Sequence, residues 1–249
     1  MDKIPFDRCN EQNLFIAGQT GIGKTYFAKN ILLPYILEHD KRQIIILDVK
    51  ETEFDLGFIV SINAFQKIED YAECSLGFWC KNKKRPRIIT IKCKRFRMEQ
   101  IELLFHYLCE SYDKILIFDE ASFYLKEYKH GRIPLYTNEF YRITTLSHNR
   151  RNNSILITQY PNDIPTEIIG SHQRGFLFYL YPKQIKYLSD ANWIPNDKEF
   201  YQWDTTDLPI SARGKFYEIP SNKVYSLKDN SILNEKPIDN IEKDKKVKN

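Results

Sequence analysis

The chain has 249 residues with a formal net charge of +4 at pH 7, and 42% of the residues are apolar. This length suits one α/β domain with a sizeable core and argues against two full domains. The charge is compatible with a polyanionic partner but is too small to indicate one. No apolar run approaches the roughly 18 residues of a membrane span, and the first residues lack a signal sequence, so we expect a cytoplasmic protein without an integral membrane segment.

Strand-like and helix-like segments alternate along the chain. An apolar strand at residues 13–17 precedes a helical pattern over 24–37, and a continuous β-branched run at 43–48 predicts a buried strand. Further strands are predicted at 88–91, 114–120, 154–159 and 175–181, and further helices at 98–112 and 138–148. The alternation predicts an α/β fold with a mostly parallel sheet and helices on both faces.

Composition divides the chain near residue 220. From residue 221 the aromatic residues nearly vanish, and Lys, Asp, Asn and Glu dominate. Such a stretch buries too little apolar surface to offset the entropy of ordering it. We therefore predict a globular domain over 1–220 and a polar, loosely ordered tail over 221–249.

Glycine is scarce in this chain and is concentrated in one place. Of 9 glycines, where average usage gives about 17, three lie at Gly18, Gly21 and Gly23. Residues 18–25 match the pattern GxxxxGK[ST], between a predicted strand and a predicted helix. In this motif backbone N–H groups and the helix N-terminus bind phosphate, the lysine reaches the β- and γ-phosphates, and the Thr hydroxyl ligates Mg²⁺. The predicted nucleotide-binding residues are Gly18, Gln19, Thr20, Gly21, Ile22, Gly23, Lys24, Thr25 and Tyr26, with ATP and Mg²⁺ as cofactors.

Polar residues end two other predicted strands. Asp119 and Glu120 follow the run at 114–118, so Asp119 is placed to hold the Mg²⁺ shell and Glu120 to polarise an attacking water. Acidic residues at this position also serve as helix N-caps. Gln159 ends the strand at 154–158 and would bind both a γ-phosphate oxygen and the water if the two strands are neighbours.

The residues around the fourth predicted strand carry a high local charge. Nine Lys and Arg residues lie within 81–97 without an acidic residue, and aromatic residues flank them at Phe78, Trp79 and Phe96. This pattern suits a contact that follows a DNA backbone without reading sequence. The alternative is a core strand whose flanks are only solvated. A second candidate DNA-contacting loop is 124–132.

These motifs together resemble the FtsK/HerA superfamily of P-loop ATPases, ring motors that pump DNA. The resemblance spans about residues 12–182 and rests on 18–25, on Asp-Val-Lys-Glu-Thr-Glu at 48–53, on the Asp119-Glu120 pair and on Leu-Ile-Thr-Gln-Tyr-Pro at 156–161. In the family the second strand ends in a similar Asp-Pro-Lys stretch, and only the first motif is specific by itself. The resemblance implies a single P-loop NTPase (RecA-like) domain. By size, the chain looks like the genome-packaging ATPases of icosahedral viruses with an internal membrane, including archaeal ones.

The resemblance also implies an arginine that completes the active site of a neighbouring subunit. Arg174, which opens the strand at 175–178, is the best match by position, and Arg150 and Arg151 are rivals. A guanidinium there would stabilise charge on the transferred phosphoryl group, although an arginine at a strand start is more often a solvated surface residue.

The motifs favour an ATP-driven DNA translocase that packages viral double-stranded DNA. The resemblance implies a homo-oligomeric ring, most simply a hexamer, in the cytoplasm of an infected host, docked through capsid or portal proteins at a capsid vertex. Alternatives are an export ATPase of filamentous viruses or conjugation, a P-loop nucleotide kinase, and an assembly protein that binds ATP without moving DNA. A GTPase is disfavoured because the sequence has no NKxD motif.

Overall fold

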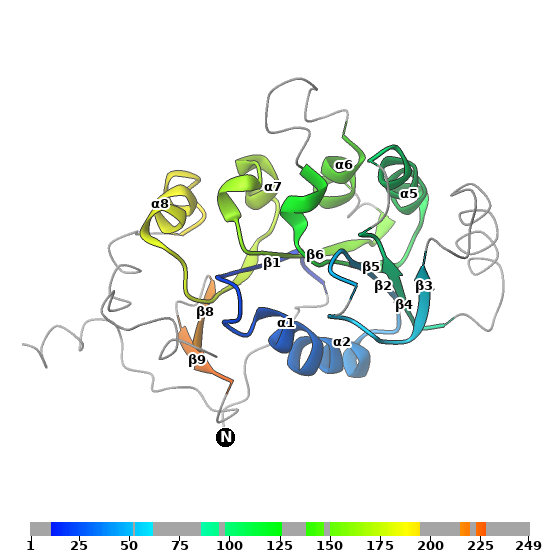
Figure 1. Ribbon diagram of the computed structural model, residues 1–249, viewed down its shortest axis with the longest axis horizontal. Helices are drawn as coiled ribbons and strands as arrows, with labels where there is room; N and C mark the ends of the chain where they lie inside the picture. Colours follow the sequence, from blue (N-terminus) through cyan, green and yellow to red (C-terminus); the bar gives the residue numbers. More distant parts are fainter. Residues whose placement is uncertain are drawn as a thin grey trace, which may run out of the picture.

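Figure 1 shows the computed structural model of the chain, whose described residues are 11–51, 53–61, 86–94, 98–125, 138–146, 150–194, 215–219 and 223–227. The described strands form one sheet in the order β3-β4-β2-β5-β6-β1-β7-β8-β9. From β3 to β7 all neighbours pair in parallel, and β8 and β9 are added antiparallel at one edge. The strands are β1 (Leu14–Ala17), β2 (Gln43–Asp48), β3 (Phe58–Ser61), β4 (Ile88–Lys92), β5 (Lys114–Phe118), β6 (Asn153–Thr158), β7 (Arg174–Leu177), β8 (Lys215–Ile219) and β9 (Lys223–Ser226).

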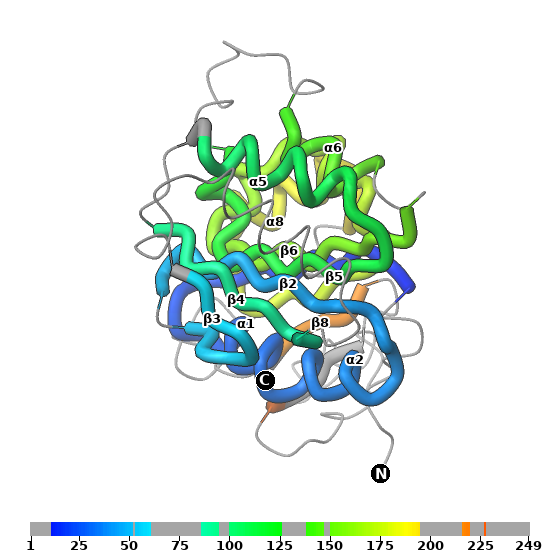
Figure 2. Tube along the Cα trace, turned by 90° about the vertical axis from the view of Figure 1, so that its right-hand side faces the viewer, coloured from blue at the N-terminus to red at the C-terminus, as the bar shows by residue number. Residues whose placement is uncertain are grey.

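Helices cover both faces of this sheet. One face carries α1 (Lys24–Phe27), a π-helical turn η1 (Ala28–Leu32) and α2 (Leu33–His39), and the other carries α5 (Met98–Glu110), α6 (Glu139–Thr145), α7 (Thr166–Gly170) and α8 (Pro182–Asp190). Figure 2, turned by 90°, shows the strands between these two layers. Short 3₁₀ turns η4 (Ala121–Leu125) and η8 (Pro161–Asp163) follow β5 and β6. Among the described helices, none combines the length and the apolar character that crossing a bilayer requires.

The central strands are buried on both faces, which explains their continuous apolar sequence. All six residues of β2 are buried. Ile45 and Leu47 belong to the core under α5–α8, whereas Ile44 and Ile46 belong to the core over α1 and α2. Because successive side chains of a strand point to opposite faces, one β-branched run supplies both cores. The predicted α/β fold with a mostly parallel sheet is confirmed.

The helix that follows β1 contains a π-helical turn, Ala28–Leu32, between its two α-helical parts. Pro34, the second residue of α2, lies just beyond this turn and cannot donate an N–H to the helix. The side-chain amide of Asn30 donates to the Tyr26 carbonyl (3.1 Å). The helix therefore covers the predicted range 24–37 but is not a regular α-helix throughout.

Two strands at the β7–β9 edge of the sheet differ from the limits predicted from the sequence. The predicted strand at 175–181 ends at Leu177, and the chain then turns into helix α8, which has Pro182 at its first turn. Strand β9 lies past residue 220, inside the range predicted as a loose tail, and pairs with β8. Four residues of mixed polarity are too short a run to stand out as a strand in the sequence. The rest of the predicted tail, 228–249, lies outside the described residues.

Candidate nucleotide-binding site

The glycine-rich loop lies at the carboxyl edge of the parallel strands. β1 lies between β6 and β7, so the loop leaves the sheet between the ends of those two strands. The Gly18 N–H donates to the Thr158 carbonyl (3.2 Å), and the Gln19 N–H donates to the Tyr179 carbonyl (2.9 Å). These bonds fix the loop to the chain on both sides of β1. This edge, beyond the carboxyl ends of the strands, is where ligands bind in open parallel sheets.

The loop needs glycine for two different reasons. Gly21 and Gly23 have φ values of 73° and 115°, in the left-handed region that favours glycine. At Gly18 the reason is close packing, because a Cβ atom would meet the Phe178 Cβ at 2.5 Å. Ile22 lies between the glycines, and its side chain packs in the core over α1 and α2. Ile22 can therefore serve a bound phosphate through its backbone only.

The Lys24 ammonium lies inside the loop. Its Nζ donates to the Gly18 carbonyl (2.6 Å) and to the Gln19 carbonyl (2.8 Å), and the residue is 6% exposed. Burial lowers the pKa of Lys24 to about 8, partly opposed by the negative charge of Glu120. The cation is thus held at the floor of the loop, with little competing solvent.

Asp119, directly after β5, is buried without a partner. Its backbone N–H donates to the Leu47 carbonyl (3.0 Å), but within the described residues neither carboxylate oxygen has a hydrogen-bond partner. Burial raises the pKa of Asp119 to about 7, and the nearby Lys50 charge acts in the opposite direction. A buried carboxylate without a donor is expensive unless a cation binds it. Its oxygens are the ligand type that Mg²⁺ prefers, so the residue fits the predicted metal role.

Glu120 joins the ends of β5 and β6. Its backbone has a φ of 52°, which is uncommon for a residue other than glycine and turns the chain sharply after the strand. One carboxylate oxygen, Oε1, accepts from Ser122 Oγ (2.9 Å), the Gln159 N–H (3.2 Å) and Thr158 Oγ1 (3.4 Å). The neighbouring strands therefore bring Glu120 and Gln159 together, as their positions in the sequence predict.

The Gln159 side chain reaches the phosphate loop. Its Oε1 accepts a hydrogen bond from Thr20 Oγ1 (2.6 Å). Gln184, in the first turn of α8, donates from Nε2 to the Gln159 carbonyl (2.9 Å) and accepts at Oε1 from Gln19 Nε2 (2.6 Å). Sequence reasoning missed Gln184, because the predicted strand at 175–181 gave no reason to place the next helix against the loop.

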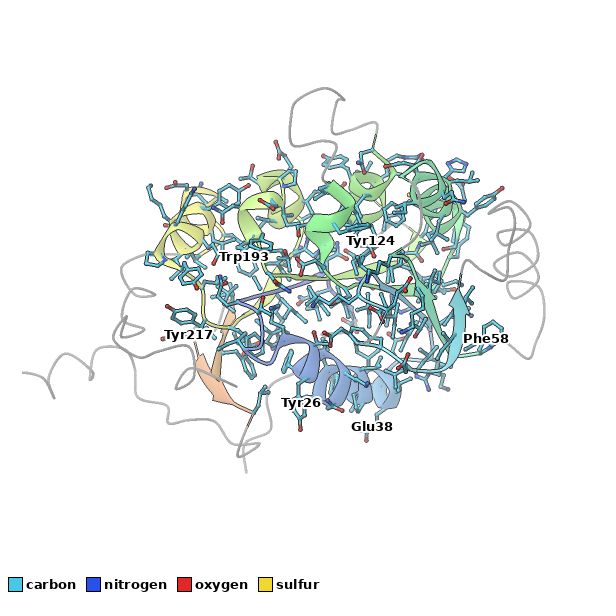
Figure 3. All side chains as sticks on the ribbon, in the orientation of Figure 1. Tyr26, Glu38, Phe58, Tyr124, Trp193 and Tyr217 are labelled. Carbon is cyan, nitrogen blue, oxygen red and sulfur yellow. The ribbon has the colours of Figure 1, made fainter. Side chains whose placement is uncertain are left out.

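A pocket of about 200 Å³ opens beside the loop. Its lining residues come from the loop, from the end of β6 and from the loop after β2: Thr20, Gly21, Gly23, Lys24, Thr25, Tyr26, Lys50, Glu53 and Gln159. Tyr26 is more than half exposed at the rim, and Figure 3 shows its side chain extending outward from α1. Lys50 and Glu53 were not predicted as site residues, although the stretch 48–53 gave a signal through its family resemblance.

The structure places the candidate arginines at the opposite, amino-terminal edge of the strands. Arg174, predicted to reach a neighbouring subunit, is buried and forms an ion pair with Glu218 of its own chain. Arg150 is partly exposed, lies 5.1 Å from the ring centroid of Tyr112 and binds Glu110 (2.8 Å). Arg151 is exposed and binds Asp113 (3.2 Å). Arg150 and Arg151, but not Arg174, therefore present a guanidinium at the surface, as a residue acting in a neighbour requires.

Six of the nine basic residues of 81–97 lie outside the described residues. The prediction that Lys92 contacts DNA is wrong, because its ammonium is buried and bound to Asp48 and Asp55. Arg87 donates to the Asp40 carbonyl, and Lys94 is exposed. In the other candidate loop, Tyr124 packs in the core and residues 126–132 lie outside the described part.

Solved structures show the fold that surrounds this site. No model of a known protein family matches the sequence, and no curated protein matches it. The genome packaging NTPase B204 of Sulfolobus turreted icosahedral virus 2, in complex with ATP-gammaS, aligns with a TM-score of 0.61 and 16% identity, over 87% of this chain and 96% of that chain. VirB4 of Thermoanaerobacter pseudethanolicus aligns with a TM-score of 0.57 and 10% identity, over 86% and 88%. The pCW3 conjugation coupling protein TcpA aligns with a TM-score of 0.50 and 17% identity, over 84% and 57%. The chain therefore has the P-loop NTPase fold that it shares with these proteins.

Proposed function

We propose that this chain hydrolyses ATP at the carboxyl edge of its sheet and uses the energy to move DNA. The observation that carries the proposal is the Glu120 carboxylate, which Thr158 and Gln159 hold beside the phosphate loop. A fixed carboxylate next to a P-loop suits a base for water, and a water-activating base separates hydrolysis from phosphoryl transfer to an acceptor.

The residues at this edge divide the chemical tasks. Backbone N–H groups of 18–25 and the Lys24 ammonium bind the phosphates. All three donors to Glu120 contact Oε1, so we assign Oε2 to the attacking water. Once a γ-phosphate is present, Gln159 Nε2 can donate to a phosphate oxygen, and Gln159 Oε1 can accept from the water in place of Thr20.

Thr25 and Asp119 are the residues that would hold Mg²⁺. The Thr25 side chain lines the pocket, and the Asp119 oxygens lack donors among the described residues. Mg²⁺ held there would supply positive charge that stabilises the charge developing as the terminal phosphoryl group transfers.

We propose that the DNA is viral and double-stranded and that the chain acts as a ring, most simply a hexamer. The fold shared with B204, whose published description is a genome packaging NTPase, supports this assignment. Such a ring works in the cytoplasm of an infected host and docks through capsid or portal proteins at a capsid vertex. Export of DNA is the second candidate, because the fold is also shared with VirB4 and with a conjugation coupling protein.

ATP turnover with and without long double-stranded DNA tests the proposal. We expect stimulation by DNA and loss of turnover in Glu120→Gln, with Glu38→Gln, which changes an exposed glutamate of α2, as the matched control. Turnover that ignores DNA, combined with rapid phosphorylation of a nucleoside monophosphate, would identify a nucleotide kinase instead.

Mixed rings test the arginine that acts between subunits. We expect Arg150→Ala subunits to be inactive alone and to regain activity when mixed with Glu120→Gln subunits, because each type then supplies what the other lacks. Arg151→Ala is mixed in the same way, since its exposed side chain makes Arg151 the rival candidate. If both variants assemble and no mixture recovers activity, Arg150 does not act in trans.

A further inference from the structure

The loop between β2 and β3 is wound around a buried lysine. Lys92, the last residue of β4, is 7% exposed. Its Nζ donates to Asp48 Oδ2 (2.8 Å) and Asp55 Oδ1 (2.8 Å), and to the carbonyls of Phe54 (2.9 Å) and Glu51 (3.0 Å). Acceptors from the start, middle and end of the loop thus converge on one cation.

Asp48 fixes the same loop from the other side. Its Oδ1 accepts the Glu51 N–H (2.9 Å), and its Oδ2 accepts the Phe54 N–H (3.1 Å). Glu51 has a φ of 63°, so the chain reverses sharply at this residue. The two anchored residues flank Glu53 on both sides, and Lys50 immediately precedes the first of them. The loop therefore presents Lys50 and Glu53 from a fixed backbone.

Such a structure is more than a connection between two strands requires. Removing two charges from water costs free energy that their attraction does not always offset, and an apolar pair would join the strands as well. A buried ion pair that fixes this loop is better explained by the need to hold the side chains of Lys50 and Glu53 in place. Lys50 and Glu53 line the nucleotide pocket together with Lys24 and Thr25.

Lys50 has a weak partner in its own chain. Its Nζ lies 3.7 Å from Glu53 Oε1, and both side chains are about one-third exposed. An ion pair of this length and exposure contributes little, so a phosphate oxygen can displace the carboxylate. The charges facing Lys50 are Lys24, Asp119 and Glu53, and the Lys50 charge lowers the pKa of both Lys24 and Asp119. Lys50 therefore lies near the two groups to which the proposed function assigns the phosphates and the metal.

We propose that Lys50 is a second phosphate-binding cation: it breaks its ion pair with Glu53 and binds the terminal phosphate of ATP. Lys92 is the positioning residue that holds the loop carrying Lys50. The inference rests on the proposed function, in that it requires the pocket to take ATP. It makes the site distinguish a triphosphate from a diphosphate through a residue outside the phosphate loop.

Binding of ADP and of a non-hydrolysable ATP analogue to the full chain, each with Mg²⁺, tests this. We expect Lys50→Met to lower the affinity for the triphosphate by about tenfold or more and the affinity for the diphosphate by much less. The reason is that only the triphosphate loses a charged contact. Glu53→Gln should raise the affinity for the triphosphate by a few-fold, since it removes the charge that competes with phosphate for Lys50. Lys183→Met, which removes an exposed lysine on α8, should leave both affinities unchanged.

Lys92→Met tests the positioning role. We expect it to reduce the ratio of triphosphate to diphosphate affinity as Lys50→Met does, which a purely structural loss would not do. If Lys92→Met does not fold, the opposite shifts expected in Lys50→Met and Glu53→Gln still decide the proposal. Equal weakening of both nucleotides in Lys50→Met, or no weakening, overturns this inference alone. Wild-type protein that binds neither nucleotide overturns the proposed function as well.

Discussion

The two edges of the same sheet differ in the charged side chains nearest the nucleotide pocket, although the carboxyl edge also has the paired Lys92 and Asp48. At the amino-terminal edge charged side chains have partners within the chain: Arg42 binds Asp40, Arg150 binds Glu110, Arg151 binds Asp113 and Arg174 binds Glu218. At the carboxyl edge Asp119 is buried without a donor among the described residues, and the pKa of Lys24 is lowered. The first edge stabilises the fold, whereas the second retains unfavourable features that a ligand can relieve.

Among substitutions at the two edges, we expect the largest effect at Glu120. Glu120→Gln keeps the size and one oxygen of the side chain but removes the base, so we expect ATP hydrolysis to fall by about 10²–10⁴-fold. Nucleotide affinity should stay within about threefold of wild type, since the carboxylate does not bind phosphate. Single-turnover hydrolysis and equilibrium binding measure the two effects. Retained turnover would mean that another group activates the water.

At the opposite edge, Arg174→Met should destabilise the fold without affecting catalysis. It leaves the buried Glu218 carboxylate without its partner, which costs about 3–5 kcal/mol of unfolding free energy. Denaturant titration measures the loss, and the double variant Arg174→Met, Glu218→Gln should recover part of it. An Arg174→Met chain with unchanged stability and no turnover would return Arg174 to the active site.

Asp119→Asn should separate stability from function. The pKa of the Asp119 carboxyl is raised from 3.8 to about 7 by burial, so the folded state binds the proton more tightly than the unfolded state. Without Mg²⁺ and nucleotide, this residue therefore lowers stability as pH rises from about 4 to about 7. We expect Asp119→Asn to gain about 2–4 kcal/mol over wild type at pH 8 and little at pH 4, while losing Mg²⁺-dependent hydrolysis. Thermal unfolding at the two pH values decides this, and an equal difference at both would contradict it.

The smallest effect concerns Lys24. Its pKa is lowered from 10.5 to about 8, so without nucleotide the ammonium loses its proton at a lower pH than an ordinary lysine does. Phosphate binding needs the charged form, and we therefore expect nucleotide affinity to be constant below pH 7 and to fall above pH 8, by up to about tenfold per unit. Calorimetric titrations in two buffers with different ionisation enthalpies should also detect proton uptake above pH 8. A flat profile between pH 7 and 9.5 would show that Lys24 stays charged.

The sequence predicts the carboxyl edge better than the amino-terminal edge. The glycine pattern, and polar residues directly after apolar strands, are local signals, and parallel strands bring their ends together. The range 43–48 predicted for β2 coincides with the observed strand. By contrast, the Arg174–Glu218 pair joins residues 44 positions apart, and only the antiparallel addition of β8 brings them together.

The loop that carries Lys50 shows the same limit. Lys92 looks like one more cation of a basic segment, since charge alone does not show whether a side chain is buried. Its partners Asp48 and Asp55 come from another part of the chain. Strand β3 was missed because it is only four residues long and its sequence shows no alternation of apolar and polar residues.

The π-helical turn after the phosphate loop has a consequence for comparing sequences. A π turn contains about one residue more than an α turn for the same rise, so Ala28–Leu32 lengthens the path from Lys24 to Asp48 by one position. A distant relative with a regular α-helix there aligns at both motifs only if a one-residue gap is placed within this turn.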